Sequence, residues 1–315
     1  NGAELFLNHE VKSISKSEYG YTVKAGDKEF STKLVVNASG TGAEEICKMI
    51  TENVGFQIKP RRGEYFVIEK NVHIVDNVIF PVPTEKGKGV LAVPTVYGNT
   101  LIGPNSEPID EASIATSDDG IKYIKDNIFR ILKEVPLNKA IRTFAGVRPS
   151  STSKDFIIEP LGEDNPNFIN IASIESPGLA SSPGITEYVI EEYIKDRLEL
   201  VPNPDAVMTR KGDIVMAKLT DEEKNAVIKE NPQYGNIVCR CEQISEGEIV
   251  AAINAVCGAR SVKGVKKRVR PGMGKCQGGF CEPKVVEILA RELNCSPVDV
   301  VLDRKKSKIL GRENR

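Results

Sequence analysis

The sequence predicts an α+β protein with a larger part rich in β-strands and a small helical part rich in cysteine. Its 315 residues correspond to about two domains at roughly 150 residues each. Apolar and polar residues alternate like strands over much of the first two thirds, whereas six of the seven cysteines lie within 239–295. With 40% hydrophobic and 28% charged residues, and no apolar run near the ~18 residues of a membrane helix, we expect neither a disordered nor a bilayer-spanning chain.

The first residues predict a β-meander followed by a buried strand. Alternating runs up to residue 24 are separated by turn residues at Gly20 and Gly26. The run 33–38 is apolar on successive residues, which is typical of a strand covered on both faces. It ends in the glycine turn 39–42, and a helix is expected next. No secretion signal precedes these strands, which favours a cytoplasmic location.

The middle of the chain, residues 61–140, predicts an antiparallel sheet covered by one helix. Its β-like runs are broken by proline and glycine. From Ser117 onward, apolar residues recur at three- and four-residue spacing, which predicts an amphipathic helix that ends before Pro136. Strands return over 141–174, and Ser182–Pro183 predicts the start of another helix.

The last third predicts a linker and a basic helical domain. Three prolines around one short helix identify 201–232 as the linker. Beyond it, Ser245 and Glu248 form a capping box that predicts a helix, and a second helix is expected over 282–294. The span 233–315 carries 16 Lys and Arg against 9 Asp and Glu, which leaves 27 against 35 for the rest. Such an excess fits nucleic acid, an acidic partner or a bound anion.

Four cysteines carry the strongest chemical signal: Cys239, Cys241, Cys276 and Cys281. They form a C-x-C and a C-x4-C motif, and four thiolates from two short loops suit a tetrahedral metal such as zinc or a [2Fe-2S] cluster. The alternatives are structural zinc and cysteines that only pack. Nearby glycines let the backbone pass close to sulfur: Gly272, Gly274, Gly278 and Gly279. Cys257 and Cys295 follow apolar helix positions and are expected to pack.

The basic excess has a cause that does not involve nucleic acid. A [2Fe-2S] cluster with four thiolates is an anion in both oxidation states, so neighbouring cations would compensate its charge. Six basic residues are candidates for this role: Lys263, Lys266, Lys267, Arg268, Arg270 and Lys275. We therefore expect no nucleic-acid partner.

These last residues resemble the bacterioferritin-associated-ferredoxin-like [2Fe-2S] domain. That family shows C-x-C, a helix, and then a G-M-G-x-C-Q-G-x-x-C loop, which matches 272–281 here. The resemblance implies a small helical domain over 233–315 that holds a [2Fe-2S] cluster through the four cysteines, with zinc as the alternative metal.

Four other segments occur in the order found in FAD-dependent oxidoreductases of the D-amino-acid-oxidase-like superfamily: Val35–Gly42, Pro60–Tyr65, Ala145–Pro149 and Ser176–Pro183. This resemblance covers residues 1 to about 200. It implies that 1–60 and 141–200 belong to an FAD-binding domain and that 61–140 form the substrate domain. Glycerol-3-phosphate dehydrogenases and L-2-hydroxyglutarate oxidases are most similar. The segments Phe80–Pro83, Gly87–Val90 and Leu101–Asn105 favour the second, and the cysteine domain favours an anaerobic form of the first.

The resemblance implies an FAD-dependent dehydrogenase that oxidises a small anionic secondary alcohol, sn-glycerol 3-phosphate first and 2-hydroxyglutarate second. Hydride would pass to the flavin, and electrons would leave singly through the [2Fe-2S] centre to an acceptor protein or a quinone. A partner subunit could associate such an enzyme with the membrane surface. The competing hypothesis is a non-enzymatic, zinc-stabilised interaction module.

The resemblance also suggests site residues. Asn37, Ala38 and Gly40 would line the flavin after one strand, and Gly178, Leu179 and Ala180 would present N–H groups and a helix dipole to it. Arg148 is the first candidate for the substrate anion, Arg62 the second, and Tyr65 could donate a hydrogen bond. His9 and His73 are interpreted as structural, so no general base is assigned.

One element of the superfamily pattern is absent from this sequence. Its members begin with a strand and G-x-G-x-x-G, which places the FAD pyrophosphate at a helix N-terminus. We therefore expect the chain to be the C-terminal part of a longer enzyme. By itself it is expected neither to retain FAD nor to oxidise an alcohol.

Overall fold

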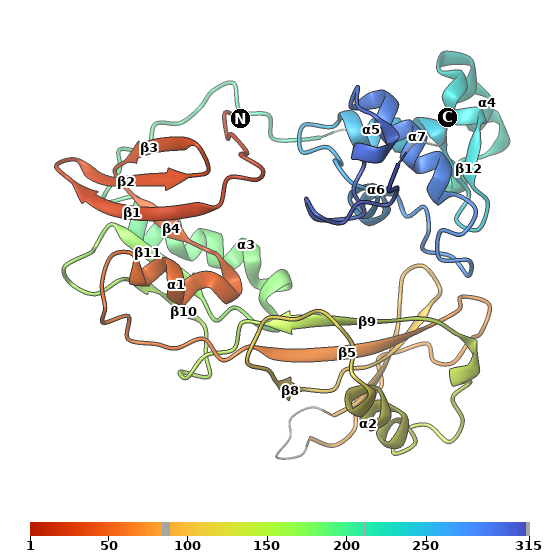
Figure 1. Ribbon diagram of the computed structural model, residues 1–315, viewed down its shortest axis with the longest axis horizontal. Coiled ribbons are helices and arrows are strands. Elements are labelled where there is room, and N and C mark those ends of the chain that lie inside the picture. The colour runs from red at the N-terminus through yellow and green to blue at the C-terminus, as the bar shows by residue number, and fades with distance from the viewer. Residues whose placement is uncertain (84–88, 211, 313–315) are drawn as a thin grey trace. The chain divides into compact units, whose positions relative to one another are not determined.

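The computed structural model describes residues 1–83, 89–210 and 212–312, and Gly87 and Lys88 of the motif noted above lie outside them. The chain forms two compact units, Asn1–Ala206 and Val207–Arg315. Figure 1 shows strands dominating the first unit and helices the second. No described helix is both long enough and apolar enough to cross a membrane.

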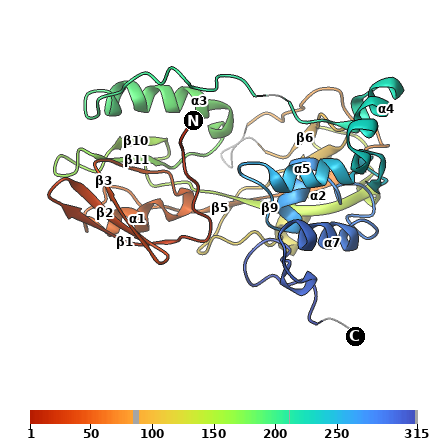
Figure 2. The same cartoon turned by 90° about the horizontal axis from the view of Figure 1, so that it is seen from above.

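The first unit begins with the predicted antiparallel meander of β1 (Val11–Ser17), β2 (Gly20–Ala25) and β3 (Lys28–Thr32). It lies beside a second sheet, because Ile14 and Tyr21 of the meander share one hydrophobic cluster with Phe168 of that sheet (Figure 2). The aromatic rings of Tyr21 and Phe168 meet edge to face at 5.9 Å.

The second sheet has the order β10-β11-β4 and contains the strand predicted to be buried. In it, β4 (Val35–Asn37) runs parallel to β11 (Phe168–Ala172), and β10 (Ile157–Pro160) runs antiparallel to β11. A single 3-10 turn, Gly40–Gly42, and α1 (Ala43–Lys48) follow β4, whereas α3 (Gly178–Val189) follows β11. Since the two strands are parallel, both helices start at the same edge of the sheet.

A third sheet is built around β5 (Arg61–Ile68). On one side β5 pairs with β7 (Thr100–Gly103) and β8 (Glu107–Pro108), on the other with β9 (Ala140–Arg148), and β6 (Leu91–Pro94) extends the sheet beyond β7. Helix α2 (Asp118–Ile128) covers one face, as predicted. Its buried residues Ile124 and Ile128 pack against Phe66 and Ile68 of β5. Ser117 caps the helix by accepting a hydrogen bond from the backbone N–H of Gly120 at 3.1 Å.

Helix α3 differs from its prediction, because it begins at Gly178 and not at Ser182. Pro183 lies inside the helix and has no N–H to offer the carbonyl of Leu179. The hydroxyl of Ser182 donates to that carbonyl at 2.9 Å, so the helix tolerates the proline. A π-helical turn, Ile190–Ile194, follows α3.

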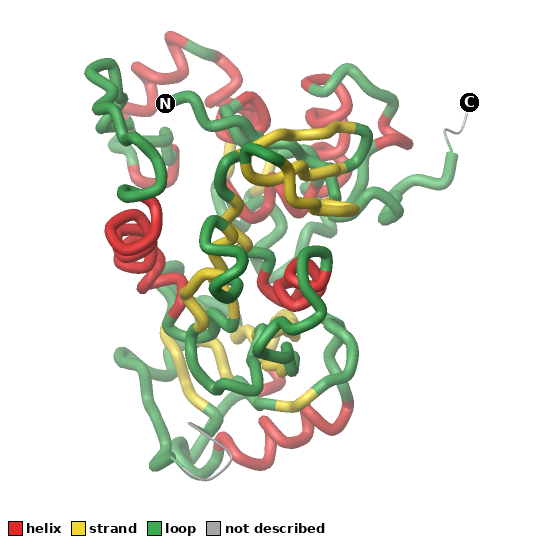
Figure 3. Tube along the Cα trace, turned by 90° about the vertical axis from the view of Figure 1, so that its left-hand side faces the viewer, coloured by secondary structure: helices red, strands yellow, loops and turns green. Residues whose placement is uncertain are grey.

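The second unit is a small helical domain. It contains α4 (Asp221–Glu230), the short pair β12 (Ile237–Cys239) and β13 (Ile244–Ser245), and the helices α5 (Glu246–Asn254), α6 (Val262–Val269) and α7 (Glu282–Glu292). The capping box expected at the start of α5 is present, and α4 also begins with one, formed by Thr220 and Glu223. Beyond α7 the described chain runs mostly as loop (Figure 3).

The second unit begins earlier in the chain than residue 233, the boundary predicted from the sequence. Met216 is buried, and its backbone N–H donates to a carboxylate oxygen of Glu248 at 3.3 Å. The part of the predicted linker that follows Ala206 therefore belongs to the second compact unit.

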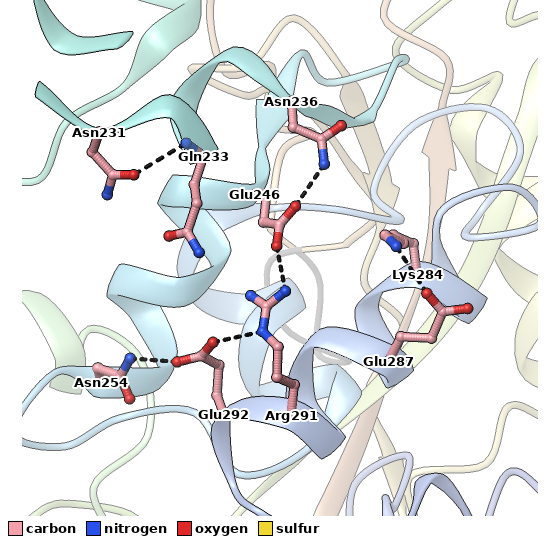
Figure 4. A network of polar contacts seen from close by, with 9 residues as sticks. All are labelled: Asn231, Gln233, Asn236, Glu246, Asn254, Lys284, Glu287, Arg291 and Glu292. Atoms are coloured by element: carbon pink, nitrogen blue, oxygen red, sulfur yellow. Dashed lines mark hydrogen bonds and ion pairs between the residues drawn. The ribbon is translucent and has the colours of Figure 1, made fainter. Parts of the chain in front are cut away.

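A polar network fastens α5 to α7 (Figure 4). The guanidinium of Arg291 contacts Glu246 at 2.6 Å and Glu292 at 2.9 Å, and Glu292 accepts a hydrogen bond from Asn254 at 2.9 Å. Asn236 donates to the second oxygen of Glu246. Burial raises the pKa of Glu246, but the contacts with Arg291 and Asn236 outweigh it, and the pKa is lowered.

Candidate functional site

Two segments predicted to line a cofactor meet at one edge of the β10-β11-β4 sheet (Figure 1). Ala38 and Gly40 follow the carboxyl end of β4, and Gly178 begins α3 just beyond the carboxyl end of β11. Gly40 has a φ of +61°, and a side chain there would meet no atom within 4 Å. Leu179, in the first turn of α3, is 93% exposed. The edge is therefore open, with the N-terminus of a twelve-residue helix directed at it.

Asn37 lies at this edge, but its side chain is turned inward and forms hydrogen bonds within the protein. The residue is buried, and its amide donates to the carbonyl of Ala43 at 2.9 Å and to the side chain of Asn170 at 3.0 Å. The thiol of Cys47 donates to the same Asn170 oxygen at 3.0 Å. These contacts join β4, β11 and α1, so Asn37 positions the edge.

Arg148 and Tyr65 lie on the face of the β5-β9 pair that α2 does not cover. Arg148 ends β9 opposite Arg61, and Tyr65 stands opposite Phe144, on which its ring stacks at 5.0 Å. The guanidinium of Arg148 lies close to the hydroxyl of Tyr65. Burial raises the pKa of Tyr65 although Arg148 opposes this effect, so the hydroxyl stays protonated.

One hydrogen-bond donor of the Arg148 guanidinium has no partner among the described residues. This donor is the buried Nη1 atom. The guanidinium lies over Gly63, where a Cβ atom would come within 2.6 Å of Nη2. A glycine at 63 therefore provides the space for this cation. Sequence reasoning did not single out Gly63, because only the strand register brings it under Arg148.

Arg62 lies on the opposite face of β5, because side chains alternate along a strand. It forms an ion pair with Glu64 at 3.2 Å. Glu64 is fully buried and accepts hydrogen bonds from Asn105 at 2.7 Å and from the backbone N–H of Ser117 at 2.6 Å. This network attaches the start of α2 to the sheet, so we do not retain Arg62 as a substrate ligand.

A hydrogen bond connects the arginine with the cofactor edge. Ser150 follows Arg148 and Pro149, and its hydroxyl donates to Glu175 at 2.8 Å, in the loop that leads into α3. Sequence reasoning missed this pair, since no motif marks two residues so far apart. The two histidines are placed elsewhere: His9 contacts Asp27 at 3.3 Å and His73 contacts Asp76 at 3.5 Å.

A cavity in the first unit does not coincide with this edge. It measures about 540 Å³ and is lined by Val54, Phe56, Leu161 and Pro166 among other residues. These residues lie near the amino end of β11, whereas the candidate edge is at its carboxyl end. We therefore do not assign the cavity to the site.

In the second unit the four predicted ligand cysteines come together in two pairs. The sulfur atoms of Cys241 and Cys276 are 3.8 Å apart, and Cys239 lies close to Cys281. No three described His, Cys, Asp or Glu side chains converge on one point. Cys239 and Cys281 belong to the hydrophobic core of the unit. Cys257 is exposed and Cys295 packs at the edge of that core.

Gly274 allows the two cysteine loops to meet. A Cβ atom at this position would overlap the Cβ atom of Cys241 and lie 3.4 Å from its sulfur. The amide of Gln277 donates to the carbonyls of Met273 and Gly274 at 3.1 and 3.0 Å and holds the loop closed. The loop is thus built so that Cys276 lies next to Cys241.

When no metal is bound, the surroundings shift the pKa values of these thiols in opposite directions. Burial raises the pKa of Cys281 to about 12 and also raises that of Cys241. Backbone N–H groups, that of Gly278 foremost, lower the pKa of Cys276. A metal bound here would displace the remaining thiol protons.

Arg270 and Lys266, which belong to the basic residues expected near this centre, contact the cysteine loops. Arg270 forms an ion pair with Glu242, next to Cys241, at 3.1 Å, and Lys266 donates to the side chain of Gln277 at 3.4 Å. Lys263 instead pairs with an aspartate of the C-terminal loop.

Comparison with known proteins agrees with both parts of the chain. Residues 1–192 match the family model described as FAD dependent oxidoreductase, and the chain belongs to this family. Residues 237–291 match the model of the BFD-like [2Fe-2S] binding domain, which indicates a [2Fe-2S] cluster. Both sequence resemblances, and the α+β fold class with a small helical cysteine-rich domain, are confirmed.

Individual proteins of known activity show which members of this family the chain is similar to. A glycerol 3-phosphate dehydrogenase of Caloramator mitchellensis is 45% identical over 314 residues, which cover 98% of this chain and 65% of that protein. The FAD-bound, reduced L-alpha-glycerophosphate oxidase of Mycoplasma pneumoniae superposes with a TM-score of 0.56 at 28% identity, over 62% of this chain and 52% of that one. The L-2-hydroxyglutarate dehydrogenase of Arabidopsis thaliana is 26% identical over 53% of this chain and 39% of that protein. The chain thus spans between two fifths and two thirds of these relatives.

Proposed function

We propose that the full-length protein that contains this chain is an FAD-dependent dehydrogenase that oxidises a small anionic secondary alcohol, sn-glycerol 3-phosphate, and passes the electrons through a [2Fe-2S] cluster. The observation that carries the proposal is the buried Nη1 atom of Arg148, which has no partner among the described residues and lies beside Tyr65 on the face opposite α2. A buried cation with a free donor is costly unless an anion completes it, and a guanidinium can hold phosphate with two hydrogen bonds.

The residues at the edge of the parallel sheet fit the flavin. Gly178 places the N-terminus of α3 at the edge, and the open turn at Gly40 leaves room beside it. A helix N-terminus stabilises negative charge, which suits the flavin ring when it is reduced. When FAD is bound, it supplies the acceptor for a hydride from the carbinol carbon of the substrate. Glu175 and Ser150 connect the two parts of the site and hold Arg148 in register with α3.

The cysteine domain fits the second half of the reaction. Hydride transfer delivers two electrons at once, whereas a [2Fe-2S] cluster carries one, so Cys239, Cys241, Cys276 and Cys281 would hold a centre that releases electrons singly. The acceptor is an electron-transfer protein or a quinone. A cytoplasmic location, with membrane contact only through a partner subunit, remains part of the proposal.

A second candidate substrate is L-2-hydroxyglutarate, because a guanidinium holds a carboxylate as well as a phosphate. The similarity to the Arabidopsis enzyme supports it. The higher identity to a glycerol 3-phosphate dehydrogenase over nearly the whole chain favours the phosphate ester.

The test combines cofactor analysis with substrate competition. This chain, purified without oxygen, is analysed for iron and labile sulfide, and the full-length protein that contains it is loaded with FAD and assayed for dye-coupled oxidation of both alcohols, with glycerol as the neutral control. We expect two irons and two sulfides per chain, faster oxidation of glycerol 3-phosphate by the full-length protein, and no oxidation of glycerol. FAD-loaded full-length protein that oxidises neither anionic alcohol would contradict the proposal, and preference for L-2-hydroxyglutarate would select the second candidate.

A further inference from the structure

The two thiol pairs of the cysteine domain lie in opposite environments. Cys239 and Cys281 are 2% and 3% exposed and pack among the apolar side chains of the core, Val285 included. Cys241 is exposed and Cys276 is partly exposed. One pair therefore borders solvent, and the other is surrounded by hydrocarbon.

Backbone N–H groups also surround the exposed pair. The N–H groups of Gly278, Gly279 and Phe280 lie close to the sulfur of Cys276, and the N–H of Cys276 lies close to the sulfur of Cys241. Donors to sulfur and contact with water both stabilise additional negative charge, whereas apolar burial destabilises it.

We propose that Cys241 and Cys276 hold one iron, that Cys239 and Cys281 hold the other, and that the added electron of the reduced protein resides on the iron of the exposed pair. The 3.8 Å separation of the Cys241 and Cys276 sulfurs suits two ligands of one tetrahedral ion. One ferric ion becomes ferrous in this step, and no bond breaks. The inference rests on the [2Fe-2S] cluster of the proposed function and not on the identity of the alcohol.

The consequence is a direction for electron transfer. An electron on the exposed iron lies at the edge where Phe280 is 89% exposed, so a one-electron partner can approach it there. An electron on the other iron would be separated from solvent by the core of the unit.

The first test needs no substitution. The whole chain with its cluster is reduced with dithionite, and the β-proton signals of its cysteines are followed by NMR as the temperature rises. Signals of cysteines on ferrous iron move away from their diamagnetic positions on warming, and those on ferric iron move toward them. We expect ferrous behaviour for Cys241 and Cys276, with Cys281 assigned through its contact with Val285 of α7. Ferrous behaviour of Cys281 would overturn the proposal.

The second test removes one donor. Phe280→Pro deletes an N–H that points at Cys276, and Phe280→Ala is the matched control, which keeps the N–H and loses the ring. We expect Phe280→Pro to lower the equilibrium constant for one-electron reduction about tenfold, or about 59 mV. Phe280→Ala should stay within about twofold. Equal potentials for the two variants would refute the role of the hydrogen bonds. Protein that holds zinc would overturn the proposed function as well, whereas ferrous iron on the buried pair would overturn this inference alone.

Discussion

Arg148→Lys offers the sharpest test of the anion site. Lysine keeps the positive charge but not the planar fork, so it makes one hydrogen bond to the substrate anion where arginine makes two. A hydrogen bond between charged groups contributes about 1.5–3 kcal/mol, which corresponds to about a 10- to 150-fold rise in KM. The Tyr65 hydroxyl would also lose its charged partner.

The assay is dye-coupled oxidation of glycerol 3-phosphate by the FAD-loaded full-length protein that contains this chain, with flavin absorbance measured on the same samples. Flavin content should not change, because Arg148 lies on β9 and the flavin residues lie at the β4 and β11 edge. Arg142→Lys is the matched control, since it makes the same substitution on the same strand at an exposed position. We expect its KM to stay within about twofold of the parent value.

Gly63→Ala tests the position of the Arg148 guanidinium while Arg148 itself is unchanged. The new methyl group would lie 2.6 Å from Nη2 of Arg148 and displace the guanidinium. KM should rise by about tenfold if the position of the charge matters. If Arg148→Lys and Gly63→Ala both leave KM within about threefold, Arg148 does not bind the substrate anion and the reasoning is refuted.

Three further predictions concern assembly and stability. Gly274→Ala should reduce the iron and sulfide content severely, because its methyl group overlaps Cys241; full cluster content by chemical analysis would contradict the loop geometry. Glu64→Gln should lower the free energy of unfolding of the first unit in urea by about 3 kcal/mol, since Arg62 loses its buried counter-charge, and a loss under about 1 kcal/mol would exclude this role. The pKa of Glu246 is lowered in the folded protein, so its contribution to stability is complete above its ordinary value of 4.5 and is lost as the pH falls through the folded pKa. Glu246→Gln should flatten that acid limb in thermal unfolding of the second unit, and an unchanged pH profile would exclude Arg291 as the cause.

Several features could be predicted from the sequence because they depend on residues close together in the chain. The meander follows from the alternation of apolar and polar residues and from the turn residues between its strands. The start of α5 follows from a capping box whose two residues, Ser245 and Glu248, are three positions apart. The cysteine motifs predict the ligand set in the same way, since C-x-C and C-x4-C each place two thiols in one loop. The domain families follow from such local strings.

The start of α3 shows where local reasoning stops. Ser182–Pro183 is a good start signal by itself. The helix nevertheless begins at Gly178, because the Ser182 hydroxyl satisfies the carbonyl that Pro183 cannot.

What the sequence by itself determined is which chemical groups this protein has: four thiols on two loops, glycine turns after buried strands, and a few arginines able to hold an anion. What only the tertiary structure decided is which of them act together. Strand register places Arg148 over Gly63 and turns Arg62 to the other face, and core packing buries Cys239 and Cys281 while Cys241 and Cys276 stay at the surface. The physical reason is that register and burial depend on contacts between residues far apart in the chain, which no local pattern encodes.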